Sequence, residues 1–109
     1  MNKMIITFFA VMSTLAGVAL AADSKEGEAT FDKSCKMCHG EKGATPNPNI
    51  SKMLGGVTIP VLGSPEVQAK SDADLKKVIT NGKGKMPAVK SVTGAAIDDV
   101  VAYLRTLKK

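Results

Sequence analysis

The chain has 109 residues and carries 15 basic against 10 acidic side chains, two cysteines and one histidine. A chain of this length is not expected to form a multidomain enzyme, and its positive excess is too small to indicate nucleic-acid binding. Apolar residues are concentrated in residues 1–21. The aromatic residues beyond that segment are Phe31 and Tyr103. A domain this poor in large apolar side chains usually needs a disulfide, a metal or a partner to stabilise its fold.

Residues 1–21 have the pattern of a secretory signal peptide. A positive start with Lys3 precedes an apolar run, and small residues around Ala21 suit cleavage there. We therefore expect a periplasmic protein with a single mature domain over residues 22–109. The alternative is that residues 1–21 stay attached as a membrane anchor, because residues 4–22 approach the roughly 20 residues that span a bilayer. We expect membrane association only in that case.

Residues 25–38 are predicted to form the first helix of the mature domain. Ser24 is the expected N-cap, and acidic residues lie early and lysines late in the segment, as the helix dipole favours. One face of this helix carries four residues at spacings of four, four and three: Gly27, Phe31, Cys35 and Cys38.

Two further helices are predicted in the second half of the chain, with a shorter turn at Ser64–Pro65 before them. The first of the two begins after a cap at Ser71 and ends at Asn81, and its inward residues are Leu75, Val78 and Ile79. The last helix covers about residues 94–108 after a cap at Thr93, with an apolar stripe of Ile97, Val100, Val101, Leu104 and Leu107. The pattern is all-α, and only residues 57–62 have extended character.

Two long segments between the helices, residues 40–63 and 82–92, are rich in glycine and proline and have no clear period. Structureless loops of this length are uncommon in a compact domain unless they are functional. We expect both loops to enclose a bound group.

The chemistry is concentrated in Cys35-Lys36-Met37-Cys38-His39. Two cysteines three apart with a histidine next in sequence are the attachment pattern of c-type haem, in which both thiols bond one porphyrin and the imidazole binds its iron. Three alternatives remain open. These are a thioredoxin-like redox pair, a zinc site, which would need further ligands, and a structural disulfide, which would leave His39 unexplained.

The second axial position of a haem iron would take a methionine or stay open. Met37 lies inside the attachment motif and cannot cross the ring, and Met53 is as readily a packing residue. Met86 lies in a glycine-rich loop and is followed by Pro87, so the backbone can curve over the ring. We expect Met86 to be the distal ligand, with Met53 or an open site as the alternatives.

Lysines flank both parts of the predicted site: Lys36, Lys42, Lys83, Lys85 and Lys90. They are expected to form a positive surface that steers acidic redox partners, and the alternative is that they serve solubility alone.

These residues resemble the small monohaem class I cytochromes c of bacteria. In that family a glycine and an aromatic residue of the first helix cross an aliphatic and aromatic pair of the last helix. The likeness assigns these roles to Gly27, Phe31, Val100 and Tyr103. Pro48 matches the proline whose carbonyl orients the haem histidine, and Lys85-Met86-Pro87 matches the distal loop. The tryptophan often found near a haem propionate is missing, so the propionate contacts do not carry over.

The resemblance implies an all-α cytochrome c fold, with three main helices and long loops wrapped around one covalent haem c and its iron. With His39 and Met86 on the iron, the protein would be a periplasmic single-electron carrier, monomeric and not an enzyme, that meets redox partner proteins and no nucleic acid. The alternative is a haem subunit or ligand sensor of a larger oxidoreductase, in which the distal ligand is labile.

Overall fold

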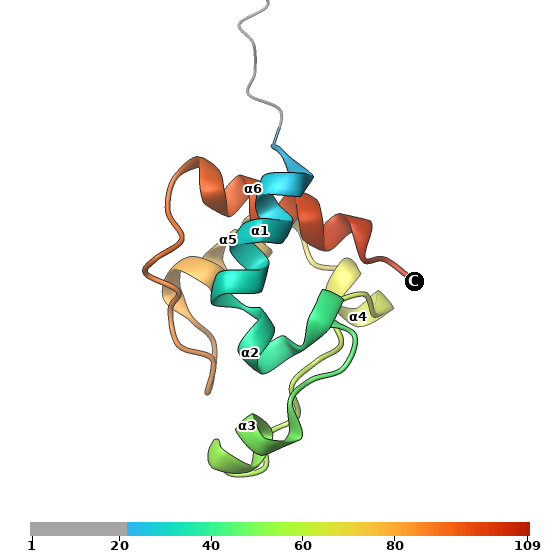
Figure 1. Cartoon of the computed structure of the whole chain (residues 1–109), viewed down its shortest axis with the longest axis vertical. Coiled ribbons are helices and arrows are strands. Elements are labelled where there is room, and N and C mark those ends of the chain that lie inside the picture. The colour runs from blue at the N-terminus through green and yellow to red at the C-terminus, as the bar shows by residue number, and fades with distance from the viewer. Residues whose placement is uncertain (1–21) are drawn as a thin grey trace, which may run out of the picture.

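The computed structural model describes residues 22–109, and the predicted signal peptide lies outside this range (Figure 1). Within it the chain is helical and contains no β-strand. In chain order the elements are α1 (Ser24–Ser34), α2 (Lys36–His39), the 3-10 turn η1 (Glu41–Gly43), α3 (Pro48–Met53), α4 (Pro65–Gln68), α5 (Asp72–Asn81) and α6 (Ala95–Thr106). None of these helices is long and apolar enough to cross a membrane.

The crossing of α1 and α6 is the main helix contact of the fold. Phe31 and Val100 are almost completely buried there, and the rings of Phe31 and Tyr103 lie with their centroids 5.3 Å apart. A Cβ atom on Gly27 would lie only 1.9 Å from the Asp99 carbonyl oxygen, so the two backbones approach as closely as glycine allows. The predicted contact between the first and last helices is confirmed.

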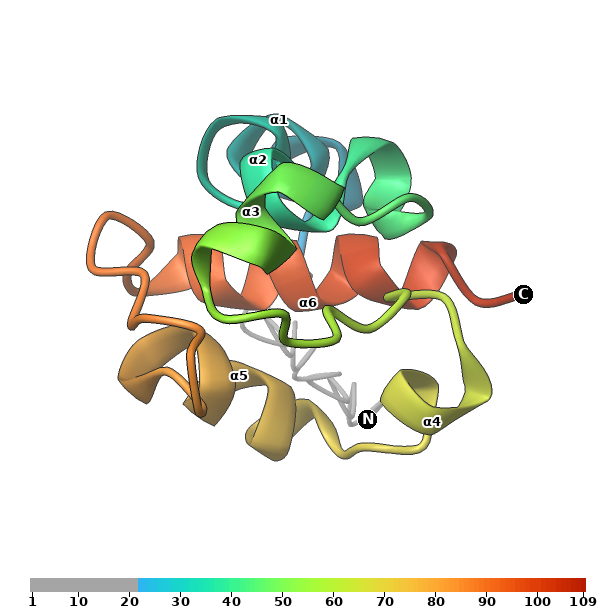
Figure 2. The same ribbon diagram turned by 90° about the horizontal axis from the view of Figure 1, so that it is seen from below.

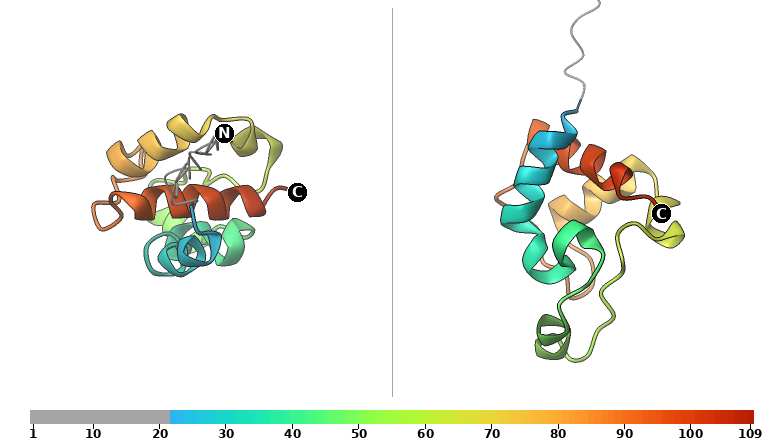
Figure 3. Two further views of the ribbon diagram at one scale, coloured as in Figure 1. Left: turned by 90° about the horizontal axis from the view of Figure 1, so that it is seen from above. Right: turned by 45° about the vertical axis from the view of Figure 1, so that its right-hand side comes forward.

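α6 is the central helix of the domain. Figures 2 and 3 show α1 on one side of it and α5 on the other. Leu75 and Ile79 of α5 pack into the core beside α6, as predicted, whereas Val78 is only partly buried. The complete set of buried apolar side chains in the described residues is Phe31, Leu62, Val67, Leu75, Ile79, Val92, Val100, Val101, Tyr103 and Leu104.

The boundaries of α5 and α4 follow the sequence signals closely. The Ser71 hydroxyl accepts a hydrogen bond from the Asp74 amide at 3.1 Å, and α5 ends at Asn81 before a glycine. The Ser64 side chain caps α4 in the same way. Both caps satisfy backbone N–H groups that a first helical turn leaves without partners.

The start of α1 and the start of α6 differ from prediction. Asp23, not Ser24, caps α1, because its carboxylate accepts hydrogen bonds from the amides of Lys25 and Glu26. α6 begins after Gly94, whose φ of +59° changes the chain direction, and no side chain caps it. Thr93 is therefore not the cap.

The predicted first helix is also interrupted. Cys35 has φ −122° and ψ −31°, so α1 ends at Ser34 and the short α2 starts in a new direction. The apolar spacing continues across this break, and the periodicity alone therefore suggested one helix.

The segment 40–63 contains more structure than predicted. The turn η1 follows α2 at once, and α3 begins at Pro48 after Asn47, whose side chain accepts from the Asn49 amide at 3.0 Å. Figure 3 shows this segment running out to α3 and back toward α4. The returning part, residues 57–61, forms no helix and no strand.

Candidate functional site

The motif Cys35–His39 lies where α1 ends and α2 begins. The Cys35 carbonyl accepts hydrogen bonds from the amides of Cys38 and His39, at 3.2 and 3.0 Å. One helical turn therefore carries both thiols and the imidazole. Both cysteines are free and partly buried, and Cys35 packs against the hydrophobic core. The three groups that the sequence singled out belong to one rigid piece of backbone.

Asn47 holds this piece of backbone from outside. Its backbone N–H donates to the Cys38 carbonyl at 3.0 Å, and its side-chain Nδ2 donates to the Met37 carbonyl at 3.2 Å. The same side chain caps α3. Sequence reasoning missed this residue, although an asparagine before a proline is a recognisable helix-start signal.

The surroundings of His39 favour the neutral form of its imidazole. Burial lowers its pKa, and the backbone carbonyl of Pro60 raises it by a smaller amount. The Nδ1 atom is buried and has no hydrogen-bond partner of normal geometry in the described residues. A neutral imidazole is the form that binds a metal ion. A buried ring nitrogen without a partner is uncommon and is suited to a bound group.

The backbone group that raises the pKa of His39 belongs to Pro60, a residue that the sequence did not suggest. Pro48, which the family resemblance proposed for this role, is exposed at the first turn of α3 and lines an outer hollow with Met37 and Gly40. The orienting role of Pro48 remains a prediction. The missed signal is weak, because Pro60 is one of five prolines in the chain.

The thiol of Cys35 is unlike that of a redox nucleophile. Burial, and then the nearby Cys38, raise the pKa of Cys35 to about 11. Thioredoxin-like cysteines instead have a lowered thiol pKa, because the thiolate is the reactive form. A zinc site needs four ligands, and in residues 22–109 no three His, Cys, Asp or Glu side chains gather for a metal ion.

The three methionines of the described region differ in exposure. Met37 is 71 % exposed and Met53 is 78 % exposed, whereas Met86 is partly buried. Met86 and Lys83 exchange both backbone hydrogen bonds, each 2.9 Å long, and so close a tight turn. Gly82 has φ +78°, and a Cβ there would lie 2.6 Å from the Met86 carbonyl oxygen. The backbone of Met86 is therefore held from both sides.

Two contacts bring the Met86 loop to the end of α1 and to α5. The hydroxyl groups of Ser34 and Ser91 lie 3.4 Å apart. Ser34 is the last residue of α1 and directly precedes Cys35. The Val89 amide donates to the Ile79 carbonyl at 2.8 Å, and Val89 packs against the same core as Cys35. Segments about 50 residues apart in sequence thus meet at one core.

These residues fit a covalently bound haem. They supply two partly buried thiols, a neutral imidazole with an unpartnered buried nitrogen, and a partly buried thioether on a held backbone. Thiols, imidazole and thioether are the donor set of a c-type haem with one histidine and one methionine on iron.

Comparison with known proteins identifies the family of this chain. The family described as "Cytochrome C oxidase, cbb3-type, subunit III" matches residues 22–104. The chain belongs to this cytochrome c family. It is similar to cytochrome c6 of Gloeothece citriformis (strain PCC 7424), with 33 % identity over 88 residues that cover 79 % of this chain and 73 % of the relative.

Two further similarities extend over most of this cytochrome. A cytochrome c6-like protein of Nostoc sp. (strain PCC 7120 / SAG 25.82 / UTEX 2576) is 30 % identical over 107 residues, which cover 95 % of this chain and 88 % of the relative. The solved structure of the KustC0563 c-type cytochrome superposes with a TM-score of 0.62 at 27 % identity, over 76 % of this chain and 98 % of that one.

The protein is a small monohaem class I cytochrome c with the all-α fold of that family. It carries covalently bound haem c with iron and acts as an electron carrier. The predicted family, fold class and cofactor are confirmed. The individual attachment and ligand residues remain predictions, which are developed below.

Proposed function

We propose that this cytochrome transfers single electrons through one haem attached at Cys35 and Cys38, with His39 and Met86 as its axial ligands. The observation that carries the proposal is the single helical turn that joins both thiols to the partly buried imidazole of His39. The bound haem supplies a one-electron iron couple.

The chain's own residues set the conditions for that couple. Asn47 fixes the turn that presents His39, and burial keeps the imidazole neutral and ready to bind iron. The thioether of Met86 would complete six-coordination and leave no position for oxygen or peroxide. A thioether favours ferrous iron more than a second imidazole does, so the reduction potential should lie in the higher range for such carriers.

Export to the periplasm is part of the proposal. Its support is the sequence of residues 1–21, with a positive start, an apolar run and small residues before Ala22. A mature protein that begins at Ala22 would be a soluble carrier over residues 22–109.

We further propose an acidic docking face on the redox partner. The five lysines that flank the predicted site are exposed: Lys36, Lys42, Lys83, Lys85 and Lys90. The structure adds a hollow along α5 that is lined by Lys70, Lys77 and Lys83, together with Asp74. Lys83 belongs to both sets, so the basic surface of the Met86 loop continues onto α5. Such a surface attracts acidic partners over distance and raises the rate of encounter.

A second candidate function is favoured by the family description itself, which names a subunit of an oxidase. In that case the same haem would pass electrons within an assembly of fixed subunits. The relatives named cytochrome c6 favour the free carrier, and they match most of this chain. Purification behaviour separates the two, because a subunit copurifies with its complex.

The ligand assignment is tested by the spectrum of the oxidised holoprotein. The weak far-red band of methionine bound to ferric iron should be present in the wild type and absent in Met86→Ala. Met53→Ala is the matched control and should keep the band, because Met53 is largely exposed. A band that survives Met86→Ala would overturn the assignment, and carbon monoxide binding by the wild type at neutral pH would favour an open site.

The docking surface is tested by the rate of electron transfer to an acidic partner protein. Raising the ionic strength should slow transfer, because salt screens the attraction between the two surfaces. Lys83→Gln should weaken this salt dependence, whereas Lys25→Gln, at the start of α1, should leave it unchanged. Equal salt dependence in all three proteins would contradict a basic docking face at Lys83.

A further inference from the structure

Asp23 fixes the beginning of α1 through three polar groups. Its backbone N–H donates to Asp99 Oδ1 at 2.8 Å, a contact between residues 76 positions apart. Its carbonyl accepts from the Gly27 amide at 2.9 Å, and its carboxylate caps α1. The N–H, the carbonyl and the carboxylate of Asp23 therefore all hold the first turn of α1, and one of them ties it to α6. Ala22, the residue before Asp23, is exposed.

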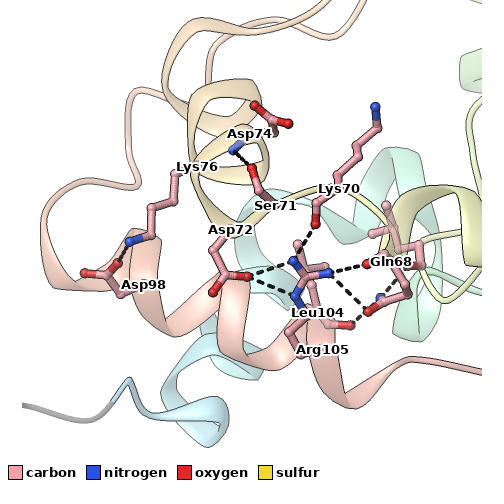
Figure 4. A network of polar contacts seen from close by, with 10 residues as sticks. Gln68, Lys70, Ser71, Asp72, Asp74, Lys76, Asp98, Leu104 and Arg105 are labelled. Carbon is pink, nitrogen blue, oxygen red and sulfur yellow. Dashed lines mark hydrogen bonds and ion pairs between the residues drawn. The ribbon is translucent and has the colours of Figure 1, made fainter.

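Asp99 is held in place by the crossing of the two helices. It lies in α6, and its carbonyl oxygen is the atom that a Cβ on Gly27 would meet at 1.9 Å. Its carboxylate takes part in neither of the two ion pairs of residues 22–109, both of which join α5 to α6: Lys76 with Asp98, and Arg105 with Asp72 (Figure 4). The partly buried Asp99 carboxylate thus accepts a hydrogen bond from the start of the chain and has no basic side chain as its partner in that range.

The mature chain of the proposed function starts at Ala22, one residue before this contact. Its first nitrogen is then an α-ammonium group, whereas the same atom of the precursor is a neutral amide. Three covalent bonds join this nitrogen to that of Asp23, so the two lie at most about 4 Å apart and the ammonium lies within about 7 Å of Asp99 Oδ1. Opposite charges at this distance attract each other even where water surrounds them.

We propose that Asp99 is the acceptor for the α-ammonium of Ala22: removal of residues 1–21 creates a charge pair that ties the start of α1 to α6. The inference rests on the export and cleavage of the proposed function. The pair adds a charge interaction to the contact between the first and last helices. The processed cytochrome is therefore more stable than a form whose chain continues beyond Ala22.

The charged side chains nearest in sequence to the proposed pair belong to two helices: Asp23, Lys25 and Glu26 at the start of α1, and Asp98 and Asp99 of α6. A positive charge at the N-terminus of a helix is unfavourable, because it opposes the helix dipole. The carboxylates of Asp23 and Glu26 offset this effect within α1, and the exposed Lys25 adds to it. Asp98 is directed to Lys76 of α5 (Figure 4). Asp99 is thus the acidic side chain that α6 presents to the start of the chain.

The experiment moves the ammonium and leaves the fold intact. A Gly-Ser-Gly insertion after Ala21 keeps the cleavage site and moves the new ammonium up to about 10 Å outward. This exceeds the screening length of about 8 Å at physiological ionic strength. The insertion is made in the wild type and in Asp99→Asn, whose amide oxygen can still accept from the Asp23 N–H. Asp98→Asn loses the same charge one residue away and is the matched control.

Denaturant unfolding of the exported holoproteins at neutral pH measures the effect. The insertion should raise the unfolding equilibrium constant of the wild type and of Asp98→Asn about threefold, the size expected of an exposed ion pair. It should leave that of Asp99→Asn unchanged.

Titration followed by NMR gives a second measurement. The pKa of the α-ammonium should lie above its ordinary value in the wild type and return toward it in Asp99→Asn, because the carboxylate favours the charged form. The stabilisation is then fully present below the ordinary pKa, and it is lost as the pH rises through the raised one. Equal values of this pKa in the two proteins would overturn the charge pair.

Failure of the proposal and failure of the proposed function are distinguishable. The mass of the exported holoprotein shows whether its chain begins at Ala22. If it does not, the proposed cleavage is wrong and the charge pair is wrong with it. If the chain begins at Ala22 but the insertion acts equally in the wild type and in Asp99→Asn, only the charge pair is overturned. Where Asp99→Asn does not fold, the wild-type pair decides, because an insertion effect that persists undiminished at high salt is not electrostatic.

Discussion

The crossing of α1 with α6 and the segment 40–63 are stabilised in different ways. The crossing is made of apolar side chains in regular helices, with Phe31 and Val100 almost fully buried. In residues 40–63, by contrast, the buried residues are Gly43, Leu62 and Gly63. This segment is held mainly by hydrogen bonds to its backbone, such as those from Leu62 and Gln68.

The difference predicts which part of the domain depends on the cofactor. Burial of apolar area is the main stabilising contribution to a small fold, and the crossing supplies it from the chain itself. The segment 40–63 has few large side chains of its own to bury. We expect a covalently held porphyrin to give it a flat apolar body to pack against, in place of the missing core.

The largest expected effect is that of losing the haem. Cys35→Ala combined with Cys38→Ala should leave the chain largely unstructured under conditions in which the holoprotein is folded. Circular dichroism and amide hydrogen exchange would measure this, and any protection that remains should lie at the α1–α6 crossing. A cooperative, helical haem-free variant would show that residues 22–109 fold without the cofactor.

The crossing itself is tested by Gly27→Ala. The added Cβ would lie 1.9 Å from the Asp99 carbonyl oxygen, so the helices must move apart. We expect the holoprotein to lose about 3 kcal/mol of unfolding free energy, at the upper end of typical overpacking costs. Denaturant unfolding measures this loss. Ala29→Ser, at an exposed position of α1, is the control, and equal stabilities of the two variants would disprove the close approach.

A smaller effect is expected in the Met86 loop. Gly82→Ala forces a side chain into φ +78° and places Cβ 2.6 Å from the Met86 carbonyl oxygen. It should cost about 2 kcal/mol of unfolding free energy and weaken the far-red band of the oxidised holoprotein. Gly84→Ala, with φ +56° and open space around its Cβ, should cost about 1 kcal/mol and keep the band.

Contradictory results would be informative here as well. If both glycine variants weaken the far-red band equally, strain anywhere in the loop disturbs Met86, and the close approach of Gly82 is not special. If neither does, the position of Met86 does not depend on the turn that Lys83 and Met86 close.

The helices that the sequence predicted well are those with a long apolar period. The stripe of α6 and the cap and inward residues of α5 are local patterns, and both helices formed where they were expected. α3 was missed because it has six residues and no apolar period, and its start is indicated only by Asn47 and Pro48. The break at Cys35 was missed because the apolar spacing of α1 continues through it.

By itself, the sequence predicted the chemistry of the site. Cys35, Cys38 and His39 are neighbours along the chain, so one turn of backbone suffices to bring them together and their spacing can be read directly. The tertiary structure alone decided which distant backbone groups surround that turn. Leu62, for example, is held between the Gly43 carbonyl and the side chain of Gln68. Such contacts depend on how separate segments pack, which no local pattern records.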